Sequence, residues 1–478
     1  MVTMLNNFYK KKNLIYFIYF VFCFFFILSL YNFIFSFKNF LLINSILLIH
    51  CISFIYYIKN EDNNNYFPIL PLISIYFFST YTLSFFISRK DFFYQNFHPG
   101  ILTKSFFIIT LGLSSLFIGY ILSGKYFSLR KIELFYFNFS NIKKKIFVLC
   151  IFLILLFFVY YINANKFLLS FTLLQQLKEP LTLFVLGLIL SMIIKKDVKS
   201  IFLHAMLILL LLTIFFVEIS QGSIVFIFSA MVFLFSIYYV FIRKISVLTI
   251  FSVILLGIFM HSIKYEIRNF IWHKDNLGTF DKIYITKNVI LKNLSLNKLK
   301  DNFSSEINKD RLFHSINSLN IVSKLTPDKV SFFHGESYKT IYTKFIPRFI
   351  WNKKPLDEQG NFWGHRYLVL NPEDKSTSWN FPVLNEFYAN FGMTGVFFGM
   401  FFLGFLIKLL ILKFWIKNIS DIEILISSII LFNFFFLENN LSQILGKVIN
   451  QFFFFHIIFI FIYLFFFLIS KFKKKFLL

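Results

Sequence analysis

The chain has few cysteines and few acidic residues. Its three cysteines, Cys23, Cys51 and Cys150, all lie in apolar runs, and they lack the spacing of a zinc site or of a disulfide that closes a loop. Asp and Glu total 23 against 48 Lys and Arg, so the formal net charge is +25. The basic residues cluster at the ends of apolar runs, where they mark the cytoplasmic side of a membrane protein. We therefore expect no nucleic-acid partner.

Apolar residues, in contrast, are abundant. Hydrophobic residues make up 58% of the chain and aromatic residues 22%, and the mean hydropathy is +0.72. A soluble domain is only about half apolar and about a quarter charged, so the excess must face lipid. The first apolar stretch, from Leu14 to Phe35, is too long for a signal peptide and has no small-residue cleavage site, so we expect it to remain as an anchor.

Apolar segments of about 20 residues are long enough to cross the bilayer core as helices. Twelve segments reach this length or come near it. The predicted fold class is therefore all-α, a polytopic integral membrane protein with about twelve transmembrane helices and one long extracytoplasmic loop. The predicted spans are Leu14–Phe35, Phe40–Tyr57, Tyr66–Ile87, Ser105–Leu122, Ile146–Ile162, Leu181–Ile194, Ile201–Val217, Ser223–Ile242, Ser246–Ile263, Phe391–Leu412, Ile422–Leu437 and Phe452–Ile469.

The distribution of Lys and Arg predicts the orientation. With both termini in the cytoplasm, most inner loops are basic and most outer loops carry few positive charges, as the positive-inside rule requires. Two places fit less well: Glu61 and Asp62 offset Lys59 in an inner turn, and Arg89 and Lys90 lie in an outer loop. The prediction is an N-terminal membrane domain of nine helices, an extracytoplasmic loop domain and a C-terminal membrane domain of three helices, over residues 1–263, 264–384 and 385–478.

The densest group of charged and aromatic residues in the loop domain runs from Phe345 to Pro355. Its two prolines stiffen the backbone that presents the side chains between them. Arg348 offers a planar fork for phosphate oxygens, and Lys353 and Lys354 add point charges. Trp351 could stack on a sugar ring or lie at the membrane interface. The alternative is an interfacial loop whose lysines reach toward the headgroups.

This run resembles the signature of the O-antigen (Wzy-type) polymerases, the oligosaccharide repeat-unit polymerases. The resemblance lies in Pro347-Arg348-Phe349-Ile350-Trp351 followed by Lys354-Pro355. Two flanking elements agree with it: a Gly-x-x-Tyr arrangement at Gly335 and Tyr338, and the stretch from Glu386 to Gly395. Specific matches cover residues 335–395, and the remainder is similar to the family in hydropathy alone.

The chain also departs from the family pattern. Asn352 stands where such polymerases often have Pro, and Gln221 stands where an Arg is expected in a Ser-Gly-x-Arg-Gly-like element at the outer start of an earlier span. Arg268, just outside the ninth predicted span, is a candidate to replace that arginine.

The resemblance implies transfer of a growing glycan from one undecaprenyl pyrophosphate carrier to the terminal sugar hydroxyl of a new lipid-linked repeat unit. The reaction would take place at the outer face of the bacterial cytoplasmic membrane and yield O-antigen or capsular polysaccharide. A chain-length regulator and a flippase are the implied protein partners. Departure of the pyrophosphate develops negative charge, which Arg348, Lys354 and Arg268 would stabilise.

The attacking hydroxyl needs a base. The candidates in the outer loop are Glu386, Asp357, Glu358 and His365. Glu386 is preferred, because burial near the start of the tenth span would hold it close to the pyrophosphate. Its alternative interpretation is an acidic residue favoured by a helix N-terminus.

The remaining candidate substrate contacts are Tyr338, His365, Arg366 and Asn390, together with Trp351, Lys353 and Lys354. The alternative for His365 is a structural hydrogen bond. Glu218, at the outer end of the seventh predicted span, is a functional candidate or an interfacial charge. The chain has no Asp-x-Asp element, so we expect neither a metal nor a cofactor.

Two other functions remain open. An O-antigen ligase has a similar plan but a different acceptor, and only the Arg-x-x-Trp element separates the two enzymes. A flippase or secondary transporter would fit the number of spans. The centres of the spans, however, are almost free of the ionisable residues that transporters place there.

Overall fold

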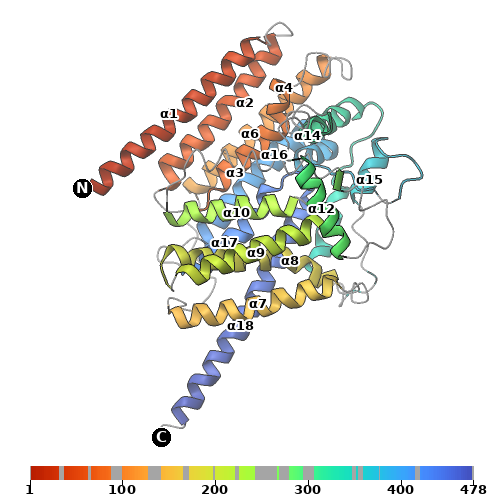
Figure 1. Cartoon of the computed structure of the whole chain (residues 1–478). Coiled ribbons are helices and arrows are strands. Elements are labelled where there is room, and N and C mark those ends of the chain that lie inside the picture. The colour runs from red at the N-terminus through yellow and green to blue at the C-terminus, as the bar shows by residue number, and fades with distance from the viewer. Residues whose placement is uncertain are drawn as a thin grey trace. The chain divides into compact units, whose positions relative to one another are not determined.

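The computed structural model describes residues 2–31, 37–62, 66–87, 99–126, 141–164, 172–197, 200–220, 225–242, 266–267, 279–293, 306–346, 351, 353, 359–375, 377–414 and 420–475. Over these residues every regular element is a helix, and none is a strand (Figure 1). The all-α prediction is confirmed for this part of the chain.

Six of the described helices are long and apolar enough to cross a membrane, which fits a polytopic membrane protein. Shorter apolar helices cover 14–30, 69–82 and 226–242. The number twelve stays a prediction, since the predicted ninth span lies outside the described residues. The six helices are Phe37–Glu61, Gly100–Gly124, Leu177–Ile194, Ile201–Glu218, Val383–Phe414 and Leu441–Leu468.

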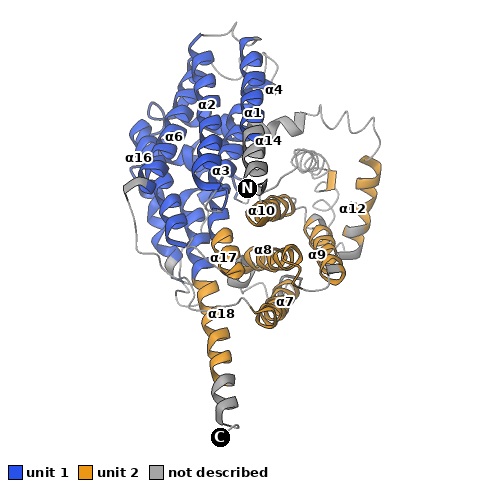
Figure 2. Ribbon diagram, turned by 90° about the vertical axis from the view of Figure 1, so that its left-hand side faces the viewer, with its two compact units in different colours: residues 1–133, 312–416, 430–452 blue, residues 134–311, 417–429, 453–478 orange. Residues whose placement is uncertain are grey.

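The chain divides into two compact units (Figure 2). Unit 1 comprises residues 1–133, 312–416 and 430–452, and unit 2 comprises residues 134–311, 417–429 and 453–478. The division into an N-terminal membrane domain, a loop domain and a C-terminal membrane domain stays a prediction.

Unit 1 contains most of the segments that resemble the polymerases. Within it, α1 packs against α2 and α2 against α6 (Figure 1). Its helices are α1 (Val2–Tyr31), α2 (Phe37–Tyr56), the π-helix η2 (Tyr57–Glu61), α3 (Ile69–Phe77), η4 (Phe78–Thr82), α4 (Leu83–Ile87), α6 (Pro99–Tyr126), most of α14 (Glu306–Leu325), η6 (Glu336–Thr340), η7 (Tyr342–Phe345), α15 (Gln359–Arg366), α16 (Val383–Phe414), η8 (Asn433–Phe435) and the first residues of α18 (Leu441–Lys475).

Unit 2 is held by apolar packing and by buried ion pairs. Its helices are α7 (Ile142–Ala164), α8 (Thr172–Ile194), α9 (Ser200–Ser220), α10 (Val225–Ile242), α12 (Thr279–Asn293), most of α17 (Asp421–Phe432) and the later residues of α18. Asp421 accepts hydrogen bonds from Lys145 of α7 and from Lys195, which directly follows α8, and Lys145 also pairs with Asp197. Lys178 of α8 pairs with Glu218 of α9. Each pair joins helix ends, where a lone buried charge would be costly.

Glycines let α6 and α16 of unit 1 approach closely. A Cβ atom on Gly404 would lie 2.0 Å from the carbonyl oxygen of Leu116, and one on Gly119 would lie 2.1 Å from that of Phe401. Such distances leave no room for a side chain. Small residues at helix contacts are how membrane helices gain packing where lipid provides no hydrophobic driving force.

We predict that Gly404→Ala destabilises unit 1, because the added methyl group would press on backbone that cannot yield. The expected loss is about 1–3 kcal/mol, as for overpacked cores. Gly446→Ala on α18 is the control, since the nearest atom to its new Cβ is a methylene of the flexible Lys344 side chain at 3.1 Å. Thermal unfolding in detergent should show a lower melting temperature for Gly404→Ala alone. Equal melting temperatures would contradict the close contact.

Candidate functional site

Helix α16 is broken near its start. Phe391 (φ −140°, ψ 17°) and Gly392 (φ 62°, ψ −143°) leave the helical conformation. The positive φ of Gly392 is a conformation that glycine adopts without steric cost. Such a break removes the amide donors that the preceding carbonyl groups would meet in a continuous helix.

The segment before η6 supplies the missing donors. The amides of Phe333 and His334 donate to the carbonyl oxygens of Ala389 and Asn390, at 3.0 and 3.1 Å. The amide of Gly335 donates to Asn390 Oδ1 at 2.8 Å, and Gly335 has φ 84°. The left-handed turn at Gly335 therefore brings three successive amides onto the broken helix.

Asn390 connects the two flanking elements of the resemblance. It has no exposed surface. Its Nδ2 donates to Ser337 Oγ at 2.9 Å and to the carbonyl oxygen of Glu386 at 2.8 Å. The Gly-x-x-Tyr element and the Glu386–Gly395 stretch, which are distant in sequence, thus lie together as one hydrogen-bonded set.

Glu386 is buried at the junction of two helix N-termini. It lies in the first turn of α16 and has no exposed surface. Its Oε2 accepts the amide proton of Leu441, the first residue of α18, at 2.7 Å. A carboxylate is stabilised by the partial positive charge there. Burial, together with the negative charge of Glu386, raises the pKa of the Tyr338 hydroxyl above its usual value.

Helix α15 joins this set through Gln359. Its Nε2 donates to the carbonyl oxygen of Ser337 at 3.1 Å and to Thr340 Oγ1, and its Oε1 accepts from Asn440 Nδ2. Thr340 Oγ1 in turn donates to Ser442 Oγ at 3.0 Å. We call the whole set the polar junction: Gly335, Ser337, Tyr338, Thr340, Gln359, Glu386, Asn390, Asn440, Leu441 and Ser442.

Sequence reasoning missed several members of the polar junction, among them Ser337, Gln359 and Asn440. Only Asn440 carried a detectable signal. It precedes an apolar helix and is followed three residues later by Gln443, which is a helix-capping pattern. Asn440 Oδ1 indeed accepts the amide proton of Gln443 at 2.9 Å.

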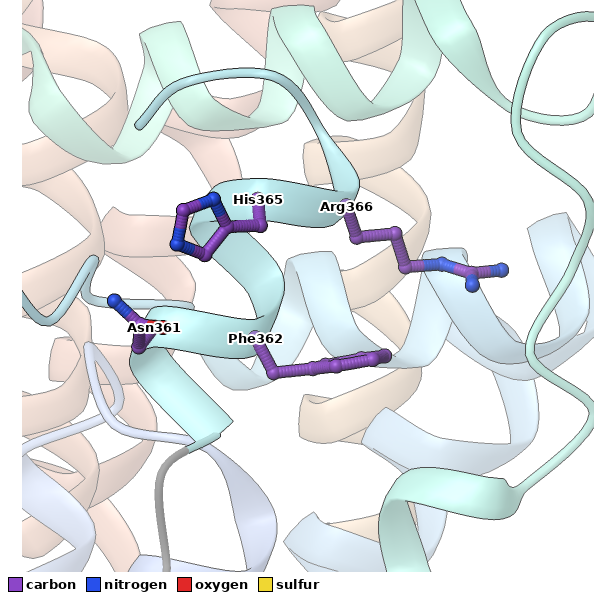
Figure 3. A pocket seen from close by; sticks show the side chains of 4 residues that line it. All are labelled: Asn361, Phe362, His365 and Arg366. Atoms are coloured by element: carbon purple, nitrogen blue, oxygen red, sulfur yellow. The ribbon is translucent and has the colours of Figure 1, made fainter. Parts of the chain in front are cut away.

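The outer face of α15 lines a cavity of about 560 Å³ (Figure 3). Its lining residues are Asn361, Phe362, His365 and Arg366. The guanidinium group of Arg366 and the ring of Phe362 extend in the same direction (Figure 3). Arg366 Nη2 donates to the carbonyl oxygen of Ser331 at 2.8 Å. The cavity thus has one cationic and one aromatic side chain on a shared face.

His365 and Asn361 bind the loop that follows α15. His365 Nε2 lies 2.8 Å from the carbonyl oxygen of Asp374; because a carbonyl only accepts, this nitrogen carries the proton. Asn361 Nδ2 donates to the carbonyl oxygens of Asp374 and Thr377, both at 2.9 Å. The contact of His365 fits its alternative interpretation as a structural hydrogen bonder.

The proline-bounded run is described at only two positions. Trp351 is half-buried and its ring stacks on that of Tyr342, with centroids 6.4 Å apart, while Lys353 is exposed. Five other sequence-predicted residues lie outside the described residues: Arg348, Lys354, Arg268, Asp357 and Glu358.

Metal-ligating side chains are scattered where the structure describes the chain. No group of three or more His, Cys, Asp or Glu residues gathers there in a metal-binding arrangement. The predicted independence from metal stays a prediction.

We predict that Asn390→Ala loosens the polar junction, because it leaves the Gly335 amide and the Ser337 hydroxyl without their buried partner. Each lost buried hydrogen bond costs about 1–3 kcal/mol, so the melting temperature should fall clearly. Asn361→Ala is the control: Asn361 also makes two hydrogen bonds, but it lies partly exposed on α15, where water can replace them. Similar melting temperatures for the two variants would contradict the central place of Asn390.

Comparison with known proteins supports the resemblance. Residues 313–475 match the family model described as O-antigen polysaccharide polymerase Wzy. This range contains η6, the proline-bounded run, α15, α16 and α18. No curated protein and no solved structure matches the chain. Over residues 313–475, which hold the whole polar junction, the chain carries the pattern of the O-antigen polysaccharide polymerase Wzy family.

Proposed function

We propose that this protein polymerises lipid-linked oligosaccharide repeat units by glycosyl transfer at the outer face of the bacterial cytoplasmic membrane. The family match supports O-antigen polymerisation by a multi-pass bacterial membrane protein, and it favours a polymerase over a ligase. The observation that carries the proposal is the polar junction. It brings Tyr338, which is distant in sequence, beside Glu386 and Asn390 at the start of one membrane helix.

The proposed reaction exchanges one bond at the anomeric carbon of the donor glycan. The acceptor hydroxyl oxygen bonds to this carbon while the bond from the carbon to the diphosphate oxygen breaks. Undecaprenyl pyrophosphate leaves with the bonding electron pair, and the hydroxyl proton passes to a base. Atoms and electrons balance in this reaction without an oxidant, a reductant or a cofactor.

Cationic side chains are proposed to stabilise the leaving diphosphate. Arg348, Lys354 and Arg268 are assigned this role on the family pattern and on their chemistry, because guanidinium and ammonium groups placed before the reaction stabilise charge that develops during it. Lys353, which is exposed, is proposed to attract the diphosphate from outside.

Glu386 is the proposed base. Its burial excludes water, which would otherwise compete with the sugar hydroxyl and hydrolyse the donor. Since the carboxylate has no exposed surface, the acceptor hydroxyl would reach it only after one of the surrounding segments moves aside. If those segments stay in place, Glu386 only positions α18 through its bond to Leu441. As a base, Glu386 must take up a proton. As a positioning residue, it needs only an oxygen that accepts the Leu441 hydrogen bond.

The sugars are proposed to bind beside the polar junction. Tyr342, which is 58% exposed, and Trp351 present an aromatic surface on which a sugar ring can pack. The cavity along α15 has a volume within the usual range for ligand sites, and Phe362 and Arg366 supply it with one apolar and one cationic surface. His365 would hold the cavity's wall rather than the substrate.

We predict that Arg348→Ala abolishes polymerisation while membrane insertion and abundance stay unchanged, because the leaving diphosphate loses its bidentate partner. The chain length of the cellular glycan measures the effect. Lys375→Ala removes an exposed cation from the loop after α15 and should leave long chains in place. Long-chain polymer in the Arg348→Ala strain would refute the role of Arg348.

A second prediction separates the two roles of Glu386. Glu386→Gln keeps an oxygen that can accept the Leu441 amide, so the protein should melt near the wild-type temperature. It cannot take a proton, so extension of a purified lipid-linked repeat unit should slow by about 100-fold or more. Glu386→Ala should lose both stability and activity. Wild-type activity in Glu386→Gln would remove the base from the mechanism and leave Glu386 as a positioning residue.

A further inference from the structure

Unit 1 has a second polar site toward the other end of α16. Lys408 lies about 16 residues beyond Gly392, or roughly 24 Å along the part of α16 that follows the break. The two sites are therefore separate along this helix.

Lys408 forms a buried ion pair with Glu61, the last residue of η2. Its Nζ donates to Glu61 Oε1, and the hydroxyl of Tyr120 donates to Glu61 Oε2 at 2.7 Å. Lys408 is 5% exposed and Glu61 1% exposed. The ammonium also lies 5.0 Å from the ring centroids of Tyr66 and Tyr120. Lys408 and Glu61 thus neutralise each other, and three helical segments are joined by their contacts.

A glycine on α6 leaves room for the Lys408 side chain. A Cβ atom on Gly124 of α6 would lie 2.9 Å from Lys408 Cε, so glycine leaves room for the lysine stem. Ionisable residues within membrane helices are rare and mark functional sites by default.

Lys408 and Glu61, although almost fully buried, also line a pocket of about 290 Å³. Tyr56 and Tyr66 form its aromatic wall, and Ile121 and Leu412 form its apolar wall. The pocket therefore offers a cation, an anion, aromatic rings and aliphatic surface to a single ligand. Glu61 and Gly124 are the last residues of two apolar helices that are long enough to cross a membrane, so a lipid headgroup is the ligand that this position favours.

We propose that this pocket binds the headgroup of a zwitterionic phospholipid that carries a primary amine. The phosphate would meet Lys408, and the ammonium group would meet the carboxylate of Glu61. A purely anionic headgroup would face Glu61, and a purely cationic one would face Lys408, so only a ligand with both charges complements the pair.

The preference for a primary amine follows from the carboxylate of Glu61. A carboxylate with its two oxygens accepts hydrogen bonds, which a primary ammonium donates and a quaternary one cannot. Ile121 and Leu412 would contact the glycerol backbone and the first methylene groups of the acyl chains. Bound in this way, the lipid would brace α2, α6 and α16 at the end that lies away from the polar junction. This inference is independent of the proposed reaction.

The test is lipid retention by the purified full-length protein, measured by native mass spectrometry. Micelles are supplied with equal amounts of phosphatidylethanolamine, phosphatidylglycerol and phosphatidylcholine of one acyl composition. The wild-type protein should retain phosphatidylethanolamine in preference to both others. Equal retention of the three, or preference for phosphatidylglycerol or phosphatidylcholine, would overturn the proposal even if no variant could be purified.

Two tryptophan variants on α16 then locate the site. Leu412→Trp fills the pocket and leaves the ion pair in place, so phosphatidylethanolamine retention should fall about tenfold. Phe402→Trp is the control, because Phe402 is 61% exposed on the same helix and should retain lipid as the wild type does. Wild-type retention by Leu412→Trp would place the lipid elsewhere and refute this site.

Discussion

The structure of the candidate site depends on a constraint imposed by burial: buried backbone groups that leave a helix must find hydrogen-bond partners within the protein. The break at Phe391 and Gly392 removes helical partners from the start of α16. Three successive amides, from Phe333 to Gly335, compensate for this loss. The segment before η6 is therefore held on α16 by backbone hydrogen bonds as well as by its side chains.

The rest of the polar junction follows from that attachment. Once Gly335 is fixed, Ser337 and Tyr338 of η6 lie over Asn390 and Glu386, and Gln359 and Asn440 bring α15 and α18 to the same place. A polar set of this kind is stable in a low-dielectric setting only when its members are hydrogen-bonded. The same balance holds at the far end of α16, where Lys408 and Glu61 neutralise each other.

Much of the fold and part of the site could be predicted from sequence. Hydropathy predicted an all-helical membrane protein, and the family resemblance predicted that Tyr338, Glu386 and Asn390 serve one site. The partnership of Glu61 with Lys408 could not be predicted, because it joins side chains 347 residues apart and depends on how helices pack. Glu61 had instead weakened the predicted inner-loop charge pattern. The helix break at Gly392 could not be predicted either, because a glycine in the sequence does not reveal which backbone amides will lie beside it.

The most direct test of this account is photo-cross-linking of the protein in a membrane with a diphosphate-linked lipid oligosaccharide whose reactive group is on the sugar next to the diphosphate. The cross-linked peptides are then identified by mass spectrometry. The account predicts labelling of peptides that contain residues 333–345, 359–366 or 386–391, and loss of this labelling when unlabelled substrate competes. Labelling confined to the Lys408 end of α16, or to unit 2, would contradict the claim that the polar junction is where lipid-linked sugars are joined.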